Sequence, residues 1–128
     1  AAGCVLGAAL HDVAPTVLAM AVCHDRPTFE SRIDRVVDEA ESLLPGEVEH
    51  SELRVLDEYR GPAYGEASPD QRDLIARVAR RTGLVLDPVY SGKALYGLCR
   101  LEPTPQRVLF IHTGGLPGLL AQSDVFEL

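Results

Sequence analysis

The side chains best suited to catalysis or ligand binding lie in one short turn, Asp87–Lys93, with the sequence DPVYSGK. The turn combines a carboxylate, a phenol ring, a hydroxyl and the only lysine of the chain. A tyrosine here could stack on a flat cofactor or act as a general acid or base, and a desolvated lysine could form a Schiff base. A structural interpretation is also open, in which Ser91 caps a helix, Tyr90 packs and Lys93 is exposed in the first helical turn.

Two other segments combine glycines with a side chain able to contact a ligand. Gly61–Gly65 (GPAYG) carries Tyr64 between glycines, and it either presents the ring to a cleft or forms a surface turn. In Val108–Gly115 an apolar run leads into HTGG, where the glycines allow a planar or anionic ligand to approach the backbone and Thr113 offers a hydroxyl. The structural alternative for this second segment is a tight turn between a strand and a helix.

The spacing of histidines and cysteines does not predict a metal site. His112 ends an apolar run and is interpreted as a core histidine with satisfied nitrogens, and the other histidines as solvent-side residues near element ends. Cys23 and Cys99 are interpreted as core residues. The sequence has no HxH, HExxH or CxxC pattern, and no P-loop, GxGxxG or GxSxG motif.

Apolar periodicity and capping residues divide the chain into alternating helices and strands. The predicted helices are Gly3–Leu10, Thr28–Leu44, the segment from Ser68-Pro69 to Gly83, Lys93–Leu101 and Leu116–Gln122. The predicted strands are Val17–Val22, one strand with its connection in Glu47–Tyr59, and Arg107–His112. This alternation predicts an α/β fold of three layers, with a mostly parallel sheet and helices on both faces. Ligands of such sheets bind beyond the carboxyl ends of the strands.

Composition limits the classes of protein that this chain can represent. With 12 basic and 19 acidic residues the net charge is −7, which argues against a nucleic acid or an anionic membrane surface as the main partner. The apolar runs are too short to span a bilayer. Three cysteines without a CxxC pair predict a reducing, cytoplasmic location rather than a disulfide scaffold. Because the chain starts at Ala1 directly before an apolar helix, we expect that upstream sequence is absent.

Three segments in this order resemble a known family. They are Gly61–Gly65 (GPAYG), Leu84–Leu98 (LVLDPVYSGKALYGL) and Val108–Ala121 (VLFIHTGGLPGLLA). They resemble the C-terminal half of the D-cysteine desulfhydrase and 1-aminocyclopropane-1-carboxylate deaminase family, which are pyridoxal-phosphate enzymes of fold type II related to the tryptophan synthase β subunit. Gly3–Leu10 resembles the helix after the family's phosphate-binding loop, so the likeness covers nearly the whole chain. The resemblance implies an incomplete fold of this type, pyridoxal 5'-phosphate as cofactor, a small amino acid as substrate and a homodimer.

The resemblance also implies roles for individual residues. Tyr90 resembles the tyrosine whose ring stacks on the pyridine ring of the cofactor, and Tyr64 resembles the second active-site tyrosine, placed near the substrate. The deaminase has a glutamate facing the pyridine nitrogen where this chain has Ser91, and a leucine where it has Thr113. A hydroxyl cannot hold a proton at that nitrogen as a carboxylate can, which favours α,β-elimination and the desulfhydrase branch. Gly114 is expected to keep the backbone close to the ring.

The family's Schiff-base lysine, its neighbouring serine and its phosphate-binding loop correspond to positions upstream of Ala1. Lys93 matches the GK of the motif and does not match the Schiff-base lysine. Residues 1–128 are therefore expected to be one α/β segment, the C-terminal part of a lyase that converts D-cysteine or a similar amino acid to pyruvate, ammonia and sulfide. This chain by itself is expected to be inactive. The alternatives are 1-aminocyclopropane-1-carboxylate deamination, or a non-catalytic remnant that binds a small molecule or a partner chain.

Overall fold

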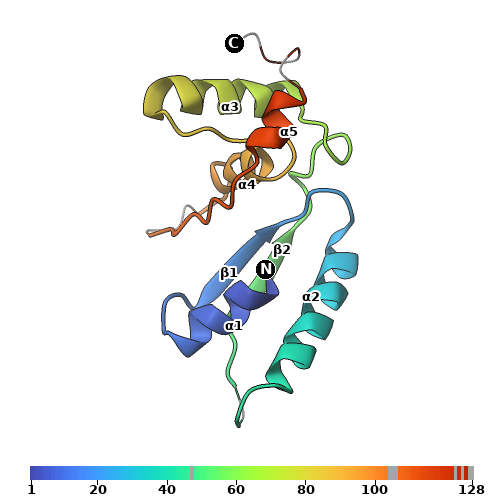
Figure 1. The fold of residues 1–128 in the computed structure, drawn as a ribbon, viewed down its shortest axis with the longest axis vertical. Helices are drawn as coiled ribbons and strands as arrows, with labels where there is room; N and C mark the ends of the chain where they lie inside the picture. Colours follow the sequence, from blue (N-terminus) through green and yellow to red (C-terminus); the bar gives the residue numbers. More distant parts are fainter. Residues whose placement is uncertain (47, 104–106, 123, 125, 127–128) are drawn as a thin grey trace. The chain divides into compact units, whose positions relative to one another are not determined.

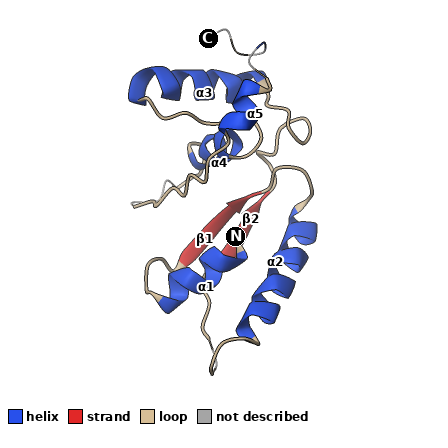
Figure 2. Cartoon of the chain, in the orientation of Figure 1, coloured by secondary structure: helices blue, strands red, loops and turns tan. Residues whose placement is uncertain are grey.

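The computed structural model of the chain describes residues 1–46, 48–103, 107–122, 124 and 126. The chain divides into two compact units, Ala1–Asp57 and Glu58–Leu128 (Figure 1). Helices and strands alternate in the first unit, and the described part of the second unit is built from helices and loops (Figure 2). The candidate residues of all three motifs lie in the second unit.

The first unit is a parallel β-α-β arrangement preceded by a helix. Its elements are α1 (Ala2–Leu10), β1 (Thr16–Met20), α2 (Arg26–Glu41) and β2 (Glu52–Leu56). The strands pair in parallel from Thr16 opposite Glu52 to Met20 opposite Leu56, and α2 lies in the crossover connection between them. Both helices and both strands of this unit were predicted, with boundaries that differ by a few residues.

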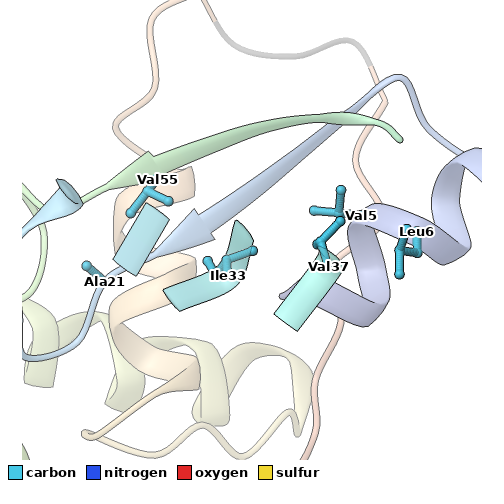
Figure 3. Close-up of a cluster of buried hydrophobic side chains, with 6 residues drawn as sticks. All are labelled: Val5, Leu6, Ala21, Ile33, Val37 and Val55. Carbon is cyan, nitrogen blue, oxygen red and sulfur yellow. The ribbon is translucent and has the colours of Figure 1, made fainter. Parts of the chain in front are cut away.

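One apolar core holds the first unit together, as Figure 3 shows. Its buried members are Val5, Leu6, Ala21, Ile33, Val37 and Val55. Ile33 and Val37 are one helical turn apart, so both project from the same face of α2. Helices α1 and α2 contact each other, and each also packs on one of the two strands. The two helices therefore share this core.

The start of α2 shows how a local cap displaces a predicted boundary. Helix α2 begins at Arg26, two residues before the predicted start at Thr28. The reason is that the Asp25 carboxylate accepts a hydrogen bond from the backbone N–H of Thr28, at 3.2 Å. A side-chain oxygen at this position satisfies one of the N–H groups that a first helical turn leaves without an intrahelical partner.

The described part of the second unit contains α3 (Pro69–Thr82), α4 (Ser91–Leu98) and α5 (Leu116–Leu120). The Ser68 side chain caps α3, and Gly83 ends it in the left-handed conformation with φ 75°, as predicted. Gln71 completes a capping box, because its side-chain oxygen accepts from the backbone N–H of Ser68 at 2.8 Å. Helix α4 begins at Ser91, two residues before the predicted start at Lys93.

The predicted strand Arg107–His112 is wrong, because the structure has an irregular segment at these residues. In the described part of the chain, β1 and β2 form the only parallel ladder, so the mostly parallel three-layer sheet does not form there. An apolar run of this length becomes a strand only where a neighbouring strand supplies ladder hydrogen bonds. Here a nitrogen of the His112 ring bonds to the carbonyl of Val85 at 2.8 Å. Phe110 packs against the buried apolar cluster of the second unit, which consists of Ile75, Leu86, Leu119 and Phe126.

The exposure of three histidines and one cysteine outside the motifs can be compared with the predictions. His11, His24 and His50 are exposed, as predicted from their places near element ends. Cys99 is exposed, so its interpretation as a core residue is wrong; it lies just after the last residue of α4. Among the described residues, none of the helices has the length and apolar character needed to cross a membrane.

Candidate functional site

The carboxylate of Asp87 organises the turn that leads into α4. It is 1% exposed and accepts hydrogen bonds from the backbone N–H groups of Val89, Tyr90 and Ser91, at 2.7, 2.8 and 2.8 Å. The Ser91 hydroxyl donates to the same carboxylate at 2.5 Å and accepts from the backbone N–H of Asp87 at 2.9 Å. Asp87, and not Ser91, therefore supplies the side-chain acceptor for the first N–H of α4 and for the two N–H groups before it.

The environment of Asp87 keeps this carboxyl ionised. Burial acts to raise the pKa of Asp87, but the hydrogen bonds from the hydroxyl and backbone of Ser91 and from the backbones of Tyr90 and Val89 outweigh burial and lower the pKa below its usual value. Hydrogen bonds to a charged acceptor are stronger than those to a neutral one. The backbone at Tyr90 and Ser91 is consequently held by a buried negative charge.

The two tyrosines predicted to be catalytic meet in the structure. Tyr64 in the Gly61–Gly65 loop and Tyr90 before α4 are 26 positions apart in the sequence, and their hydroxyls are hydrogen-bonded to each other. Their rings meet edge to face, with centroids 6.1 Å apart and an interplanar angle of 70°. Tyr64 is 58% and Tyr90 50% exposed, so both rings are open to a ligand.

The HTGG segment is positioned by its histidine. The ring nitrogen Nδ1 of His112 accepts from the backbone N–H of Gly114 at 3.1 Å, so Nδ1 carries no proton. The other nitrogen, Nε2, therefore carries the proton and donates to the carbonyl of Val85. Both ring nitrogens of His112 are thus hydrogen-bonded, as predicted, but the residue is only partly buried and is not a core histidine. It holds a turn in which Thr113 and Gly114 are exposed.

Asp87 also contacts the HTGG segment. Gly115 has φ 124°, and a Cβ atom built on it would lie 2.4 Å from Oδ1 and 2.5 Å from Cγ of Asp87. At Gly114 the φ is 111°, but a Cβ atom there would meet nothing within 4 Å. Only a residue without a side chain fits at Gly115. The structure therefore joins the DPVYSGK turn directly to the HTGG segment.

Replacing Gly115 with alanine is expected to lower the free energy of unfolding by about 3 kcal/mol, because it adds steric overlap with Asp87 to the strain of a positive φ. Gly114→Ala is the matched control, since it introduces a similar backbone strain in open space. Urea unfolding of the two variants measures the difference. Equal losses for both would contradict the close contact between Gly115 and Asp87.

The burial of the Lys93 side chain differs from the structural interpretation of the sequence. That interpretation placed it at the surface, but the side chain is 0% exposed, and its amine donates to the carbonyl of Ala63 at 2.8 Å. The reason is a contact distant in the sequence: the Gly61–Gly65 loop lies against the side chain and accepts the hydrogen bond from its amine. An amine held inside the second unit in this way is not presented to a substrate. The geometry therefore does not favour a Schiff base on Lys93.

Neither the hydrogen-bonding role of Asp87 nor the burial of Lys93 was predicted, although Asp87 had a local signal. An aspartate side chain can close a turn by accepting hydrogen bonds from the backbone N–H groups two to four residues later. The order Asp-Pro-x-x-Ser, found here at Asp87–Ser91, is typical of such a turn. The burial of Lys93 had no local signal, because it depends on a loop that is 30 positions away in the sequence. No cluster of three or more metal-ligating side chains occurs among the residues that the structure describes.

Exposed groups at the start of α4 and in the HTGG segment could contact a planar aromatic cofactor. The Tyr90 ring is half-exposed, the Thr113 hydroxyl is at the surface, and Gly114 leaves open space where other residues have a Cβ. Ser91 is 7% exposed, and its hydroxyl proton is directed to Asp87. The oxygen of Ser91 therefore faces any further group as a neutral acceptor.

The sequence of the chain is similar to enzymes of one family. A Pyrococcus abyssi protein named provisionally as a 1-aminocyclopropane-1-carboxylate deaminase is 39% identical over 121 residues, which cover 92% of this chain and 36% of the relative. The bifunctional D-cysteine desulfhydrase/1-aminocyclopropane-1-carboxylate deaminase of Arabidopsis thaliana, named as mitochondrial, is 35% identical over 129 residues, which cover 96% of this chain and 31% of the relative. No family model matches the sequence.

The fold agrees with the sequence. A crystal structure of a 1-aminocyclopropane-1-carboxylate deaminase homologue matches with a TM-score of 0.82 and 34% identity, covering 97% of this chain and 38% of that one. The fold and the sequence together place the chain in the class of these deaminase-like α/β enzymes. It belongs to the 1-aminocyclopropane-1-carboxylate deaminase and D-cysteine desulfhydrase family, which confirms the resemblance of the motifs. The chain spans less than half the length of the relatives that it matches.

Proposed function

We propose that this chain is the C-terminal part of a pyridoxal-phosphate lyase of the D-cysteine desulfhydrase type. The full-length enzyme would convert D-cysteine or a similar small amino acid to pyruvate, ammonia and sulfide by α,β-elimination. The main support is the paired hydroxyls of Tyr64 and Tyr90, from two motifs of a family that is named for these reactions. The relatives are longer than this chain, which supports a larger enzyme that includes the Schiff-base lysine.

In this proposal the tyrosine pair contacts the cofactor and the substrate. When bound, pyridoxal phosphate supplies an electron sink for the reacting amino acid. The exposed Tyr90 ring offers a flat apolar face against which an aromatic ring can pack. One hydroxyl of the pair donates to the other, so the accepting hydroxyl keeps its own proton for a third group. The pair can therefore hold or deliver a proton next to a bound substrate.

The choice of the desulfhydrase branch depends on Ser91 and Thr113. Ser91 places a neutral oxygen where the family's deaminase has a carboxylate, and its proton is directed to Asp87. A neutral oxygen stabilises a protonated ring nitrogen less than a carboxylate does. The electron sink is then weaker, which suits elimination of a good leaving group such as sulfide.

Deamination of 1-aminocyclopropane-1-carboxylate is the second candidate, because that activity appears in the names of the relatives, including the bifunctional Arabidopsis enzyme. Homodimer formation and a cytoplasmic location stay predictions of the motif resemblance and of the cysteine usage. The Arabidopsis relative is named as mitochondrial.

The test is a comparison of substrates in the full-length enzyme loaded with pyridoxal phosphate. We expect sulfide and pyruvate from D-cysteine at a higher kcat/KM than ammonia from 1-aminocyclopropane-1-carboxylate. Thr113→Leu and Ser91→Glu are each expected to lower D-cysteine turnover roughly tenfold, equivalent to about 1.4 kcal/mol. Thr113→Leu is the cleaner variant because Thr113 is exposed, whereas Ser91→Glu adds a second carboxylate beside the buried Asp87.

Ser91→Ala is the control for folding, since it removes the bond to Asp87 without adding a charge. Unchanged rates in Thr113→Leu and Ser91→Glu would show that the branch assignment depends on other residues. If the loaded enzyme turned over neither substrate, the proposed function would be wrong.

A further inference from the structure

We propose that Lys93 is a positioning residue, which holds the Gly61–Gly65 loop by its backbone and so presents Tyr64 to Tyr90. This inference rests on the proposed function of the two tyrosines. It adds a residue that neither contacts the substrate nor belongs to the tyrosine pair. It also gives a role to the only lysine in the chain.

The contact that carries the inference is adjacent to Tyr64. The amine of Lys93 donates to the carbonyl of Ala63, the residue directly before Tyr64, at 2.8 Å. The same carbonyl accepts from the backbone N–H of Glu66 at 3.2 Å, which closes the loop as an antiparallel bridge between Ala63 and Glu66. One carbonyl therefore receives both the bond that closes the loop and the bond that attaches it to α4.

Because Lys93 is buried, the hydrogen bond between its amine and the carbonyl of Ala63 is costly to lose for both partners. Lysine is almost never fully buried without partners, because an amine taken from water must regain its hydrogen bonds. Lys93 is 0% exposed, and the carbonyl of Ala63 supplies one of these bonds. Moving the loop away would remove that acceptor from a buried amine, and replacing the amine would remove a donor from the loop.

The loop itself has little apolar packing to hold it. Pro62, Ala63 and Tyr64 are all exposed, so the burial of side chains does not position this tip. Side-chain donors attach its neighbouring backbone instead. The Gln71 amide donates to the carbonyl of Tyr59 at 2.7 Å, and the Gln122 amide donates to the carbonyl of Gly65 at 2.8 Å. Lys93 is bonded to the residue directly before Tyr64, and Gln122 to the residue directly after it.

The first turn of α4 thus positions both tyrosines. Tyr90 directly precedes α4, and its backbone N–H is bound by Asp87. Lys93 follows Tyr90 by one helical turn and binds the backbone next to Tyr64. A rigid helical turn sets the distance between Tyr90 and Lys93, so the two attachments together fix how the tyrosines meet. Loss of the Lys93 bond leaves Tyr90 in place and removes the attachment on the N-terminal side of Tyr64, while Gln122 still binds Gly65.

The test uses the full-length enzyme with Lys93→Met, which keeps much of the side-chain stem and removes the amine. We expect exchange of the backbone amides of residues 63–66 with deuterium to become about tenfold faster or more, since a buried hydrogen bond from a charged group is lost. The kcat for D-cysteine should fall about ten- to a hundredfold with KM little changed, because Tyr64 is misplaced. Lys93→Arg, which retains a donor, should recover part of the loss.

A double variant separates positioning from a general loss of structure. If Lys93 acts through Tyr64, then Lys93→Met should lower kcat much less in a Tyr64→Phe background than in the wild type. Equal losses in both backgrounds would overturn the role of Lys93 in positioning Tyr64. Arg100→Met is the matched control; this cation lies just beyond α4 and stacks on the Tyr96 ring, 3.5 Å from its centroid. It should leave exchange at residues 63–66 unchanged.

The exchange measurement distinguishes this inference from the proposed function. Unchanged exchange at residues 63–66 in Lys93→Met would overturn the inference, whatever the activity. If exchange rises but the wild-type enzyme uses neither amino acid, the proposed function fails and only the attachment of the loop is supported. Should Lys93→Met not fold, acetylation of the wild-type enzyme decides. Lys93 should then be modified far more slowly than free lysine added to the same solution, and equal rates would overturn the inference.

Discussion

Tyr90→Ala is expected to lower the kcat of the full-length enzyme by about a hundredfold or more, while the protein still folds. The fold survives because Asp87 binds the backbone N–H of Tyr90 and not its side chain, which is half-exposed. Activity is lost because one substitution removes both the ring face and the hydroxyl that bonds to Tyr64. Steady-state kinetics with D-cysteine and circular dichroism measure the two effects.

Tyr90→Phe separates the two contributions of this side chain, since it keeps the ring and removes only the hydroxyl. A loss close to that of Tyr90→Ala would assign the effect to the hydroxyl pair, and a small loss would assign it to ring packing. Tyr96→Phe, within α4, is the matched control, because the Tyr96 hydroxyl makes a long bond to the exposed Asp70, at 3.4 Å. Near wild-type turnover in Tyr90→Ala would remove Tyr90 from the proposed mechanism.

Asp87→Asn is expected to lower the free energy of unfolding by about 3 kcal/mol at neutral pH, the range for disrupting a buried, hydrogen-bonded charge. An asparagine amide carries N–H donors where the carboxylate now accepts from Val89, Tyr90 and Ser91. At least one of these backbone N–H groups would lose its acceptor. Urea unfolding at neutral pH measures the change.

The contribution of the Asp87 carboxylate to the free energy of unfolding depends on pH. Because folding lowers the pKa of Asp87, the stabilisation is fully present above the unfolded-state value of about 3.9 and is lost as the pH falls through the folded-state pKa. The contribution of this carboxyl to the free energy of unfolding therefore rises with pH in the acid range. Asp87→Asn should remove that part of the dependence. Asp70→Asn, at an exposed carboxylate in the first turn of α3, should have a small effect on both quantities.

A fall in stability on acidification that is identical in wild type and Asp87→Asn would contradict the role of Asp87 as a buried, ionised cap. A loss in Asp87→Asn no larger than in Asp70→Asn at neutral pH would contradict it as well. Either result would also weaken the structural link between the DPVYSGK turn and the HTGG segment, which depends on the contact of Asp87 with Gly115.

The features that were predicted correctly are those that depend on neighbouring residues. Ser68 and Gly83 define the ends of α3, because a cap needs only a side chain or a left-handed glycine next to the helix. The apolar spacing that places Ile33 and Val37 on one face of α2 likewise follows from the helical repeat. The order of the three motifs identified the family without any knowledge of their arrangement in space.

The remaining features depend on contacts between residues that are distant in the sequence, and only the tertiary structure decides them. Arg107–His112 has the composition of a strand but has no ladder partner among the described residues. Lys93 has the local context of an exposed helical residue, yet it is buried because the Gly61–Gly65 loop covers it and accepts its hydrogen bond. The same folding of the loop onto α4 brings Tyr64 to Tyr90. The sequence by itself therefore indicated which residues are candidates for the chemistry, and the long-range packing of a loop on a helix decided how they meet.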